Sequence, residues 1–392
     1  MSAVSPSSPV RRPPLPALTG LRTLLALNIV LFHFTPQHLH YLYPVIDNAY
    51  VFVGFFFLIS GFVLTYNYAD RALGLRNYNF YIARFARIYP TYLLTLLISL
   101  PMVGEEWHAR SRAEFWQGML LTPISMQGWI PSIATFWNTV GWTVSAEVAL
   151  YLAFPFMLRA AARSRMWNWS APRLILLGLT VWLVGLIPHS LYIVFNPDHL
   201  PLPINRFSYG IYLRALKFGP MSYLCIFLAG GILARVHFRL KLGSMQRLVL
   251  CVVALVSLGL FFQKAIPAGV PYVLIHGCIL LPLFSMLTLG LAGPNPVAAV
   301  FSWKPLVKLG EATFALYLLH FNVFVMIHAY HLPERLHVAQ WDPWISYVFL
   351  LVLAYAVMNL FEKPMRQLIL GRMLPRPQAA MASAKAVEPQ LV

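Results

Sequence analysis

Charged residues are scarce in this chain of 392 residues. Asp, Glu, Lys and Arg together make up 10% of the sequence, whereas they make up roughly 25% of an average soluble domain. Hydrophobic residues make up 59%, and the mean hydropathy is +0.68. This composition excludes a soluble globular protein and indicates an integral membrane protein.

Acidic residues are fewer still, with 12 Asp and Glu against 29 Lys and Arg, and the formal net charge is +17. The basic residues lie in short clusters between apolar runs, which is typical of membrane topology and lipid contact, so no nucleic-acid partner is expected. The three cysteines, Cys225, Cys251 and Cys278, lie inside apolar runs without disulfide or metal-site spacing. They are predicted to be small core residues, and no metal site is predicted.

Apolar runs long enough to cross a bilayer, about 20 residues each, recur along the chain. The predicted fold is all-α, a polytopic membrane protein with about ten transmembrane helices in one domain over residues 17–370. The flanking segments, 1–16 and 371–392, are predicted to be disordered cytoplasmic termini. The ten candidate spans are residues 17–36, 48–66, 80–103, 138–160, 173–190, 218–236, 247–263, 270–291, 305–329 and 343–362.

The basic residues between these spans predict the orientation of the chain. With a cytoplasmic N-terminus, 21 of the 29 Lys and Arg residues fall on the cytoplasmic side and 7 on the outer side. This bias alternates with every crossing, as the positive-inside rule requires, and it predicts a cytoplasmic membrane location with both termini in the cytoplasm. The long outer loops around 103–137 and 188–217 are expected to cap a cavity that opens outward.

The first span carries two polar side chains, Arg22 and His33. They are eleven residues apart, which in an α-helix is about 20° past three full turns and about 16 Å along the axis. Both therefore lie on one helix face, with Arg22 towards the cytoplasm and His33 in the outer half. Because such groups are costly in a bilayer, this face is predicted to line a protein interior or a wet cavity. A snorkelling Arg22 and a structural hydrogen bond at His33 are the alternatives.

Two arginines, Arg84 and Arg87, begin the third span three residues apart and share a helix face. Guanidinium groups bind phosphate bidentately, so the pair suits either a phosphate ligand or lipid headgroups. In the second span, Ser60 and Gly61 lie in a continuous apolar run. They predict a close approach of two helices, with the Ser60 hydroxyl bonded to a backbone carbonyl.

Two further spans carry polar residues. Glu147 lies roughly nine residues into the fourth span, with Ser145 just before it and Tyr151 one turn deeper. A carboxylate at this depth is a functional candidate, and a structural partner of a buried arginine is the alternative. In the ninth span, Tyr317 and His320 are polar, and His320 reaches the outer half of the membrane. A histidine with a carboxylate nearby can act as a general base on a hydroxyl.

Six short motifs, in order along residues 20–364, resemble those of membrane acyltransferase family 3, a group of ten-span enzymes that modify carbohydrates. One departure is Thr143-Val144, where the family usually has Ser-Leu. The matching stretches are Arg22 with His33, Phe56 to Phe62 (FFLISGF), Arg84 to Pro90 (RFARIYP), Trp142 to Pro155, Gly310 to His320, and Glu362-Lys363-Pro364.

The resemblance implies a membrane O-acyltransferase that moves an acyl group, commonly acetyl, from cytoplasmic acyl-CoA (acetyl-CoA in the simplest case) to a hydroxyl of a carbohydrate or glycosylated acceptor. It implies that His33 is catalytic, as the base that deprotonates the acceptor hydroxyl or as a transient acyl carrier. It implies that Arg22 binds donor phosphate or polarises the thioester carbonyl. Arg84 and Arg87 are expected to hold the phosphates of the coenzyme.

The remaining candidates complete this predicted site. Glu147 and His320 are expected to orient the catalytic histidine or the acceptor. Ser145, Tyr151 and Tyr317 are expected to contact the substrate. The expected partners are acyl-CoA, the acceptor and membrane lipid, without a metal.

Two other functions fit parts of the sequence. A transporter or flippase would also explain charge within the membrane and interrupted spans, and a membrane protein without chemistry would leave the aligned polar residues unexplained. Binding of coenzyme A distinguishes the enzyme from both. Four tryptophans of the outer loops suit either stacking on sugar rings or anchoring at the membrane interface, namely Trp107, Trp116, Trp129 and Trp137.

Overall fold

The computed structural model describes residues 12–36 and 39–374. Within these ranges the chain forms helices and turns but no strand, which confirms the all-α prediction. The predicted disordered termini fall largely on residues 1–11 and 375–392, outside the described residues. The α-helices are α1 (Pro16–His33), α2 (Tyr43–Ile46), α3 (Val51–Tyr68), α4 (Asn77–Ile98), α5 (Met102–Ala109), α6 (Arg112–Leu121), α7 (Trp142–Arg163), α8 (Ala171–Phe195), α9 (Ile211–Phe218), α10 (Leu224–Arg239), α11 (Ser244–Leu260), α12 (Tyr272–His276), α13 (Leu281–Leu291), α14 (Pro296–Phe301), α15 (Lys304–Glu311), α16 (Thr313–Ala329), α17 (Leu332–Arg335), α18 (Trp344–Val357) and α19 (Lys363–Met373).

Eight helical stretches in the described residues are long and apolar enough to cross a membrane, and two bent helix pairs bring the number to ten. Each of the ten overlaps one predicted span. The third and ninth spans are each a bent helix pair, because α4 and α5 meet at 74° and α15 and α16 meet at 65°. Pro101, which lacks an amide hydrogen, lies at the first bend. At the second, the Ala312 amide donates to the Leu309 carbonyl in a tightened turn.

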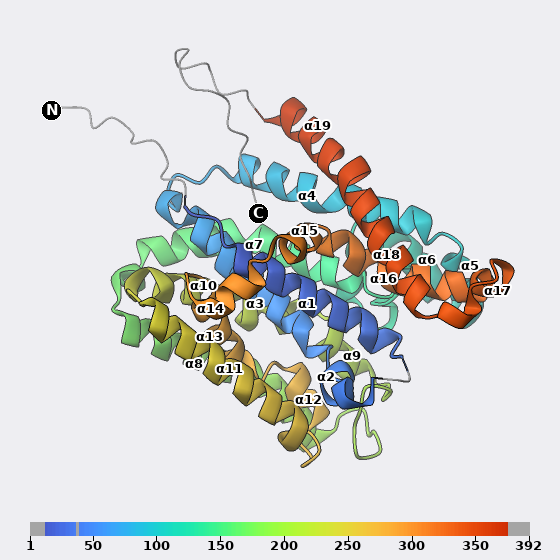
Figure 1. Ribbon diagram of the computed structural model, residues 1–392, viewed down its shortest axis with the longest axis horizontal. Coiled ribbons are helices and arrows are strands. Elements are labelled where there is room, and N and C mark those ends of the chain that lie inside the picture. Colours follow the sequence, from blue (N-terminus) through green and yellow to red (C-terminus); the bar gives the residue numbers. More distant parts are fainter. Residues whose placement is uncertain (1–11, 37–38, 375–392) are drawn as a thin grey trace.

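The helices α1 and α3 cross the middle of the bundle, whereas α8 and α11 lie at its edge (Figure 1). In an apolar stretch of 18 residues of the span built on α3, 78% of the residues are buried inside the protein, against 11% in the corresponding stretch of α8. Side chains of α3 therefore face protein on nearly every side, while most of α8 is left as an apolar outer surface. α3 packs on α10, α10 on α8, and α1 on α15 and α16.

Close contact between α3 and α10 depends on glycine. A Cβ atom on Gly61 would clash with the Phe227 carbonyl oxygen of α10, and one on Gly230 would clash with the Leu58 carbonyl oxygen of α3. The predicted close approach at Gly61 is therefore confirmed. The prediction for Ser60 was wrong, because its hydroxyl forms a hydrogen bond of 3.0 Å with the Tyr151 hydroxyl instead of a backbone carbonyl.

The substitution Gly61→Ala is expected to lower the free energy of unfolding by about 1–3 kcal/mol, the usual cost of overpacking a core. The added methyl group meets a backbone oxygen, which cannot rotate away as a side chain would. Thermal unfolding of the detergent-purified protein measures the effect. The matched control is Gly259→Ala in α11, where an added Cβ has no described heavy atom within 4 Å and better helix propensity should leave stability equal or slightly higher. Equal losses in both variants would contradict this packing argument.

Candidate functional site

A cavity of about 400 Å³ lies between α1, α3, α4, α7 and α16. We call it the arginine cavity, because Arg22, Arg84 and Arg87 line it together with Glu147 and Tyr151. These five residues come from three helices, and the sequence predicted each of them as a site residue. The fold therefore brings one part of the predicted site into a single space.

Glu147 is the carboxylate at the centre of this group. The Tyr151 hydroxyl donates to Glu147 Oε1 at 3.3 Å, and the charges of Arg22, Arg87 and Arg84 all act on the carboxylate. A carboxylate so deep in an apolar bundle needs such partners. Three guanidinium groups around one carboxylate leave the cavity with an excess of positive charge.

Arg87 has a second acidic partner that the sequence analysis did not select as a site residue. Its Nη1 atom lies 2.7 Å from Oε1 of Glu362, whose side chain is 1% exposed. Glu362 ends a π-helical turn, Met358–Glu362, that joins α18 to α19. By contrast, Arg84 Nε is buried and has no hydrogen-bond partner among the described residues. Arg84 is thus the more available of the two guanidinium groups for an incoming anion.

A second cavity, of about 320 Å³, contains His33 and is called the histidine cavity. His33 and Phe32, at the end of α1, line it with Tyr317 of α16 and Trp142 of α7. Further lining residues come from the loop before α7, from the segment around α9 and from α12. The two long loops predicted to cap an outer cavity both contribute to it.

His320 lies directly behind His33. The two imidazole ring centroids are 5.2 Å apart, and His320 Nδ1 is 2.6 Å from the Tyr317 carbonyl oxygen. Because a carbonyl can only accept, Nδ1 carries the proton. His320 Nε2 is buried and has no hydrogen-bond partner in the described part of the chain. His320 therefore supports His33 from within the protein and is not a lining residue of the cavity.

The arginine cavity and the histidine cavity are separate, with no lining residue in common among the residues described. They approach each other across one helical turn, which rises 5.4 Å. On α3, Phe56 lines the arginine cavity and Val53 lines the histidine cavity. On α16, Phe314 lines the arginine cavity and Tyr317 lines the histidine cavity. Glu147 therefore lies with the arginines and not beside the catalytic candidate of the other cavity.

Ser145 lies apart from both cavities, as far as the described residues define them. Its hydroxyl donates to Gln127 Oε1 at 3.1 Å and accepts from the Gly128 amide at 3.2 Å. The side chain is 1% exposed. Ser145 was predicted to contact the substrate. In the structure its side chain contacts the loop before α7.

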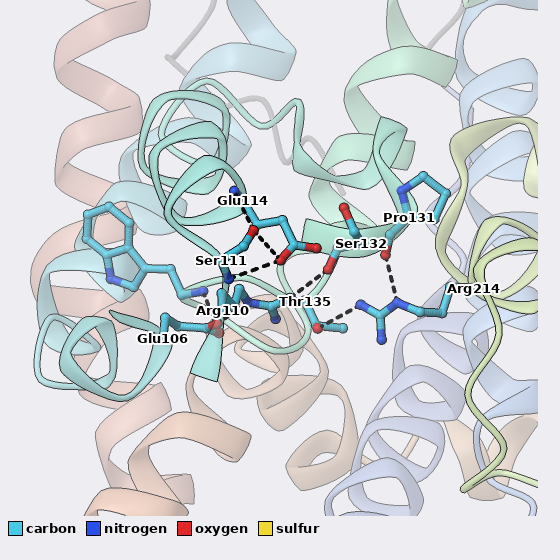
Figure 2. A network of polar contacts seen from close by, with 9 residues as sticks. Glu106, Arg110, Ser111, Glu114, Pro131, Ser132, Thr135 and Arg214 are labelled. Atoms are coloured by element: carbon cyan, nitrogen blue, oxygen red, sulfur yellow. Dashed lines mark hydrogen bonds and ion pairs between the residues drawn. The ribbon is translucent and has the colours of Figure 1, made fainter. Parts of the chain in front are cut away.

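The loop before α7 is held against the rest of the bundle by two arginines (Figure 2). Arg214 of α9 donates from Nε to the Pro131 carbonyl at 2.7 Å and from Nη2 to the Thr135 hydroxyl at 3.1 Å. Arg110 Nη1 donates to the Ser132 carbonyl at 2.6 Å. Because Thr135 lines the histidine cavity, these bonds fix one wall of that cavity.

Sequence reasoning missed several residues of the histidine cavity. Arg206 and Lys217 were counted only as outer positive charges, although both line the cavity. The one sequence feature that could have indicated their role was their position in a predicted outer loop rich in Pro and Tyr. The four loop tryptophans singled out earlier line neither cavity within the described structure, whereas Trp142 lines the histidine cavity.

Substituting Glu362→Gln is expected to destabilise the protein, because Arg87 then loses its buried partner. Removing one partner of a buried ion pair costs up to about 3–5 kcal/mol, and the partial exposure of Arg87 places the expected loss towards the lower end. Thermal unfolding is the measurement. The control is Glu311→Gln, which breaks the half-exposed pair of Glu311 with Lys363 and is expected to cost about 0–1 kcal/mol. A Glu362 variant as stable as the control would show that the ion pair contributes little.

Comparisons with known proteins agree with these motifs and their placement. Residues 15–362 match the acyltransferase 3 family, described as an acyltransferase domain. The acyltransferase MdmB of Streptomyces mycarofaciens is 27% identical over 351 residues, which cover 84% of each chain. The O-acetyltransferase OatA of Staphylococcus aureus is 22% identical over 356 residues, which cover 83% of this chain but 53% of OatA, so this chain spans about half the length of that relative.

No solved structure gives a significant match to this chain. The family match nevertheless extends over most of the sequence, and it includes every residue singled out from α1 to the end of α18. The transporter alternative has no comparable support. We conclude that the chain belongs to the acyltransferase 3 family and is a multi-pass membrane O-acyltransferase.

Proposed function

We propose that this enzyme transfers an acyl group, acetyl in the simplest case, from cytoplasmic acyl-CoA to a hydroxyl of a carbohydrate or glycosylated acceptor. The observation that carries the proposal is the arrangement of two cavities. Three arginines surround one cavity, and His33 lines another that is one helical turn away. The printed name of OatA, an O-acetyltransferase, supports acetyl as the group and oxygen as its destination.

The donor binds in the arginine cavity in this proposal. Guanidinium groups suit phosphates because they bind them bidentately, and Arg84 lines this cavity. Arg87, held by Glu362, adds charge from a fixed position. The bias of basic residues supports a position of this cavity on the cytoplasmic side of the inner membrane, with both termini in the cytoplasm and lipid around the outer helices.

Arg22 could bind the phosphates of the donor or polarise its thioester carbonyl, and the geometry favours phosphate binding. Its Cα atom lies about 16 Å from that of His33 along α1, and it lines the arginine cavity while His33 lines the other. Arg22 therefore binds the donor, near its phosphates or the start of the pantetheine arm. A thioester carbonyl under attack at His33 is too far away for Arg22 to polarise it.

His33 is the general base in this scheme. Its imidazole takes the proton from the acceptor hydroxyl as the oxygen attacks the thioester carbonyl carbon. A new C–O bond forms, the C–S bond breaks, and the proton passes from His33 to the departing thiolate. To reach His33, the pantetheine arm crosses the one helical turn that separates the two cavities. His320 positions the imidazole from behind, and Tyr317 contacts the acceptor.

The variants His33→Ala and Arg84→Ala test the two halves of this scheme. His33→Ala is expected to bind acetyl-CoA like wild type but to lose transfer, because only the base is removed. Arg84→Ala is expected to weaken acetyl-CoA binding about tenfold or more, the effect of losing one charged hydrogen bond. Calorimetry on the nanodisc-reconstituted protein measures binding, and release of free coenzyme A thiol measures turnover.

The control for Arg84 is Arg173→Ala, an exposed arginine of α8 that should leave binding unchanged. Two results would overturn the proposal. One is a wild-type protein that does not bind acetyl-CoA, and the other is full turnover by His33→Ala.

The substitution Arg22→Lys separates the two roles of Arg22. Lysine keeps the charge but loses the planar fork, so donor binding should weaken. The Michaelis constant for acetyl-CoA is expected to rise about tenfold with kcat nearly unchanged. A fall in kcat at constant KM would instead assign Arg22 to the thioester carbonyl.

A further inference from the structure

The histidine cavity carries positive charge without a matching acid. Arg206 and Lys217 both line it, and its lining contains neither Asp nor Glu within the described residues. The rest of the lining is mainly aromatic and aliphatic. A cation in such surroundings is costly unless it is paired.

Arg206 lies close to the catalytic candidate. Its guanidinium carbon is 5.1 Å from the centroid of the Phe32 ring, and that ring is 4.9 Å from the ring of His33. One carboxylate, Asp47, lies 3.6 Å from Arg206. It is half-exposed and outside the cavity lining, and exposed pairs of this kind contribute little. One face of the Arg206 charge is therefore available to a ligand.

Lys217, unlike Arg206, has no carboxylate partner in the described structure. Its Nζ atom donates to the Arg206 carbonyl oxygen at 3.3 Å and lies 5.4 Å from the centroid of the Tyr272 ring. Burial, together with the nearby charge of Arg214, lowers the pKa of Lys217 to about 8. An ammonium group in this state gains stability from any anion placed beside it.

We propose that the acceptor carries an acidic group, a carboxylate or a phosphate, which Arg206 and Lys217 hold while a neighbouring hydroxyl reaches His33. This inference rests on the proposed function, because it names the class of acceptor for the same site. The cavity volume of about 320 Å³ is at the small end of ligand pockets, roughly 300–1,000 Å³. It suits one sugar ring with its acidic substituent.

The acidic group also serves the chemistry. When His33 takes the hydroxyl proton, an imidazolium forms near two other cations. Glu147 cannot offset it, because that carboxylate lies in the arginine cavity. An anion on the acceptor supplies the missing negative charge at the place and time at which the imidazolium forms. An acceptor with a cationic amino sugar at this position is disfavoured for the same reason.

Binding of three matched sugars tests the proposal. Methyl glucoside, methyl glucuronide and methyl glucoside 6-phosphate are titrated into the full-length protein in nanodiscs of zwitterionic lipid. Wild type is expected to bind at least one acidic sugar about tenfold or more tighter than the neutral one. The double variant Arg206→Gln/Lys217→Gln is expected to lose that preference. The control Arg335→Gln, an exposed arginine of α17, is expected to keep it.

Three outcomes overturn the proposal. The first is equal binding of all three sugars by wild type, and the second is a preference that the double variant retains. The third is a preference lost in Arg84→Ala, which would place the anion in the arginine cavity. The titration is then repeated in nanodiscs of anionic lipid. If headgroup phosphates bind Arg206 and Lys217, the preference for acidic sugars disappears, and the cavity is a lipid site. Acetyl-CoA binding by each variant reports folding and tests the proposed function separately.

Discussion

The cost of placing charged side chains among apolar membrane helices organises this structure. Arg22, Arg84 and Arg87 can be accommodated because they share one cavity with Glu147, and because Glu362 pairs with Arg87 from the far end of the chain. That arrangement requires α1 and α3 to lie inside the bundle. Contacts such as that of Gly61 with α10, where the backbones come too close for a Cβ atom, hold them there. The polar site therefore depends on these close helix contacts, because they keep the helices that line it inside the bundle.

The cost of charge among apolar helices also explains why the charged side chains gather in two separate cavities. The arginine cavity suits an anionic ligand, while the histidine cavity contains His33 and two cations of its own. Only one turn of α3 and of α16 lies between the two spaces. In the function we propose, a narrow acyl-bearing arm crosses that distance while the charged part of the coenzyme stays with the arginines.

The walls of the histidine cavity combine residues of several helices with the loops before α7 and α9. Arg214 and Arg110 fix the loop before α7 through backbone carbonyls, so a wall residue such as Thr135 has a defined position. In the proposed function, these loops therefore contribute to acceptor binding, while the arginines that bind the donor lie on helices.

The sequence by itself determined the ten spans, because a span depends on a local run of about 20 apolar residues. It also determined most of the arginine cavity, since a charge inside a span is costly and is rarely present without a role. Only the tertiary structure decided where the helices bend and which charges meet. Glu362 reaches Arg87 across 275 positions. Arg206 and Lys217 reach the cavity of His33 from the loop before α9 and from α9 itself. Ser145 is the opposite case. It is close to Glu147 in sequence, but its side chain does not line the arginine cavity. Contacts between distant segments depend on packing geometry, which no local pattern in the chain encodes.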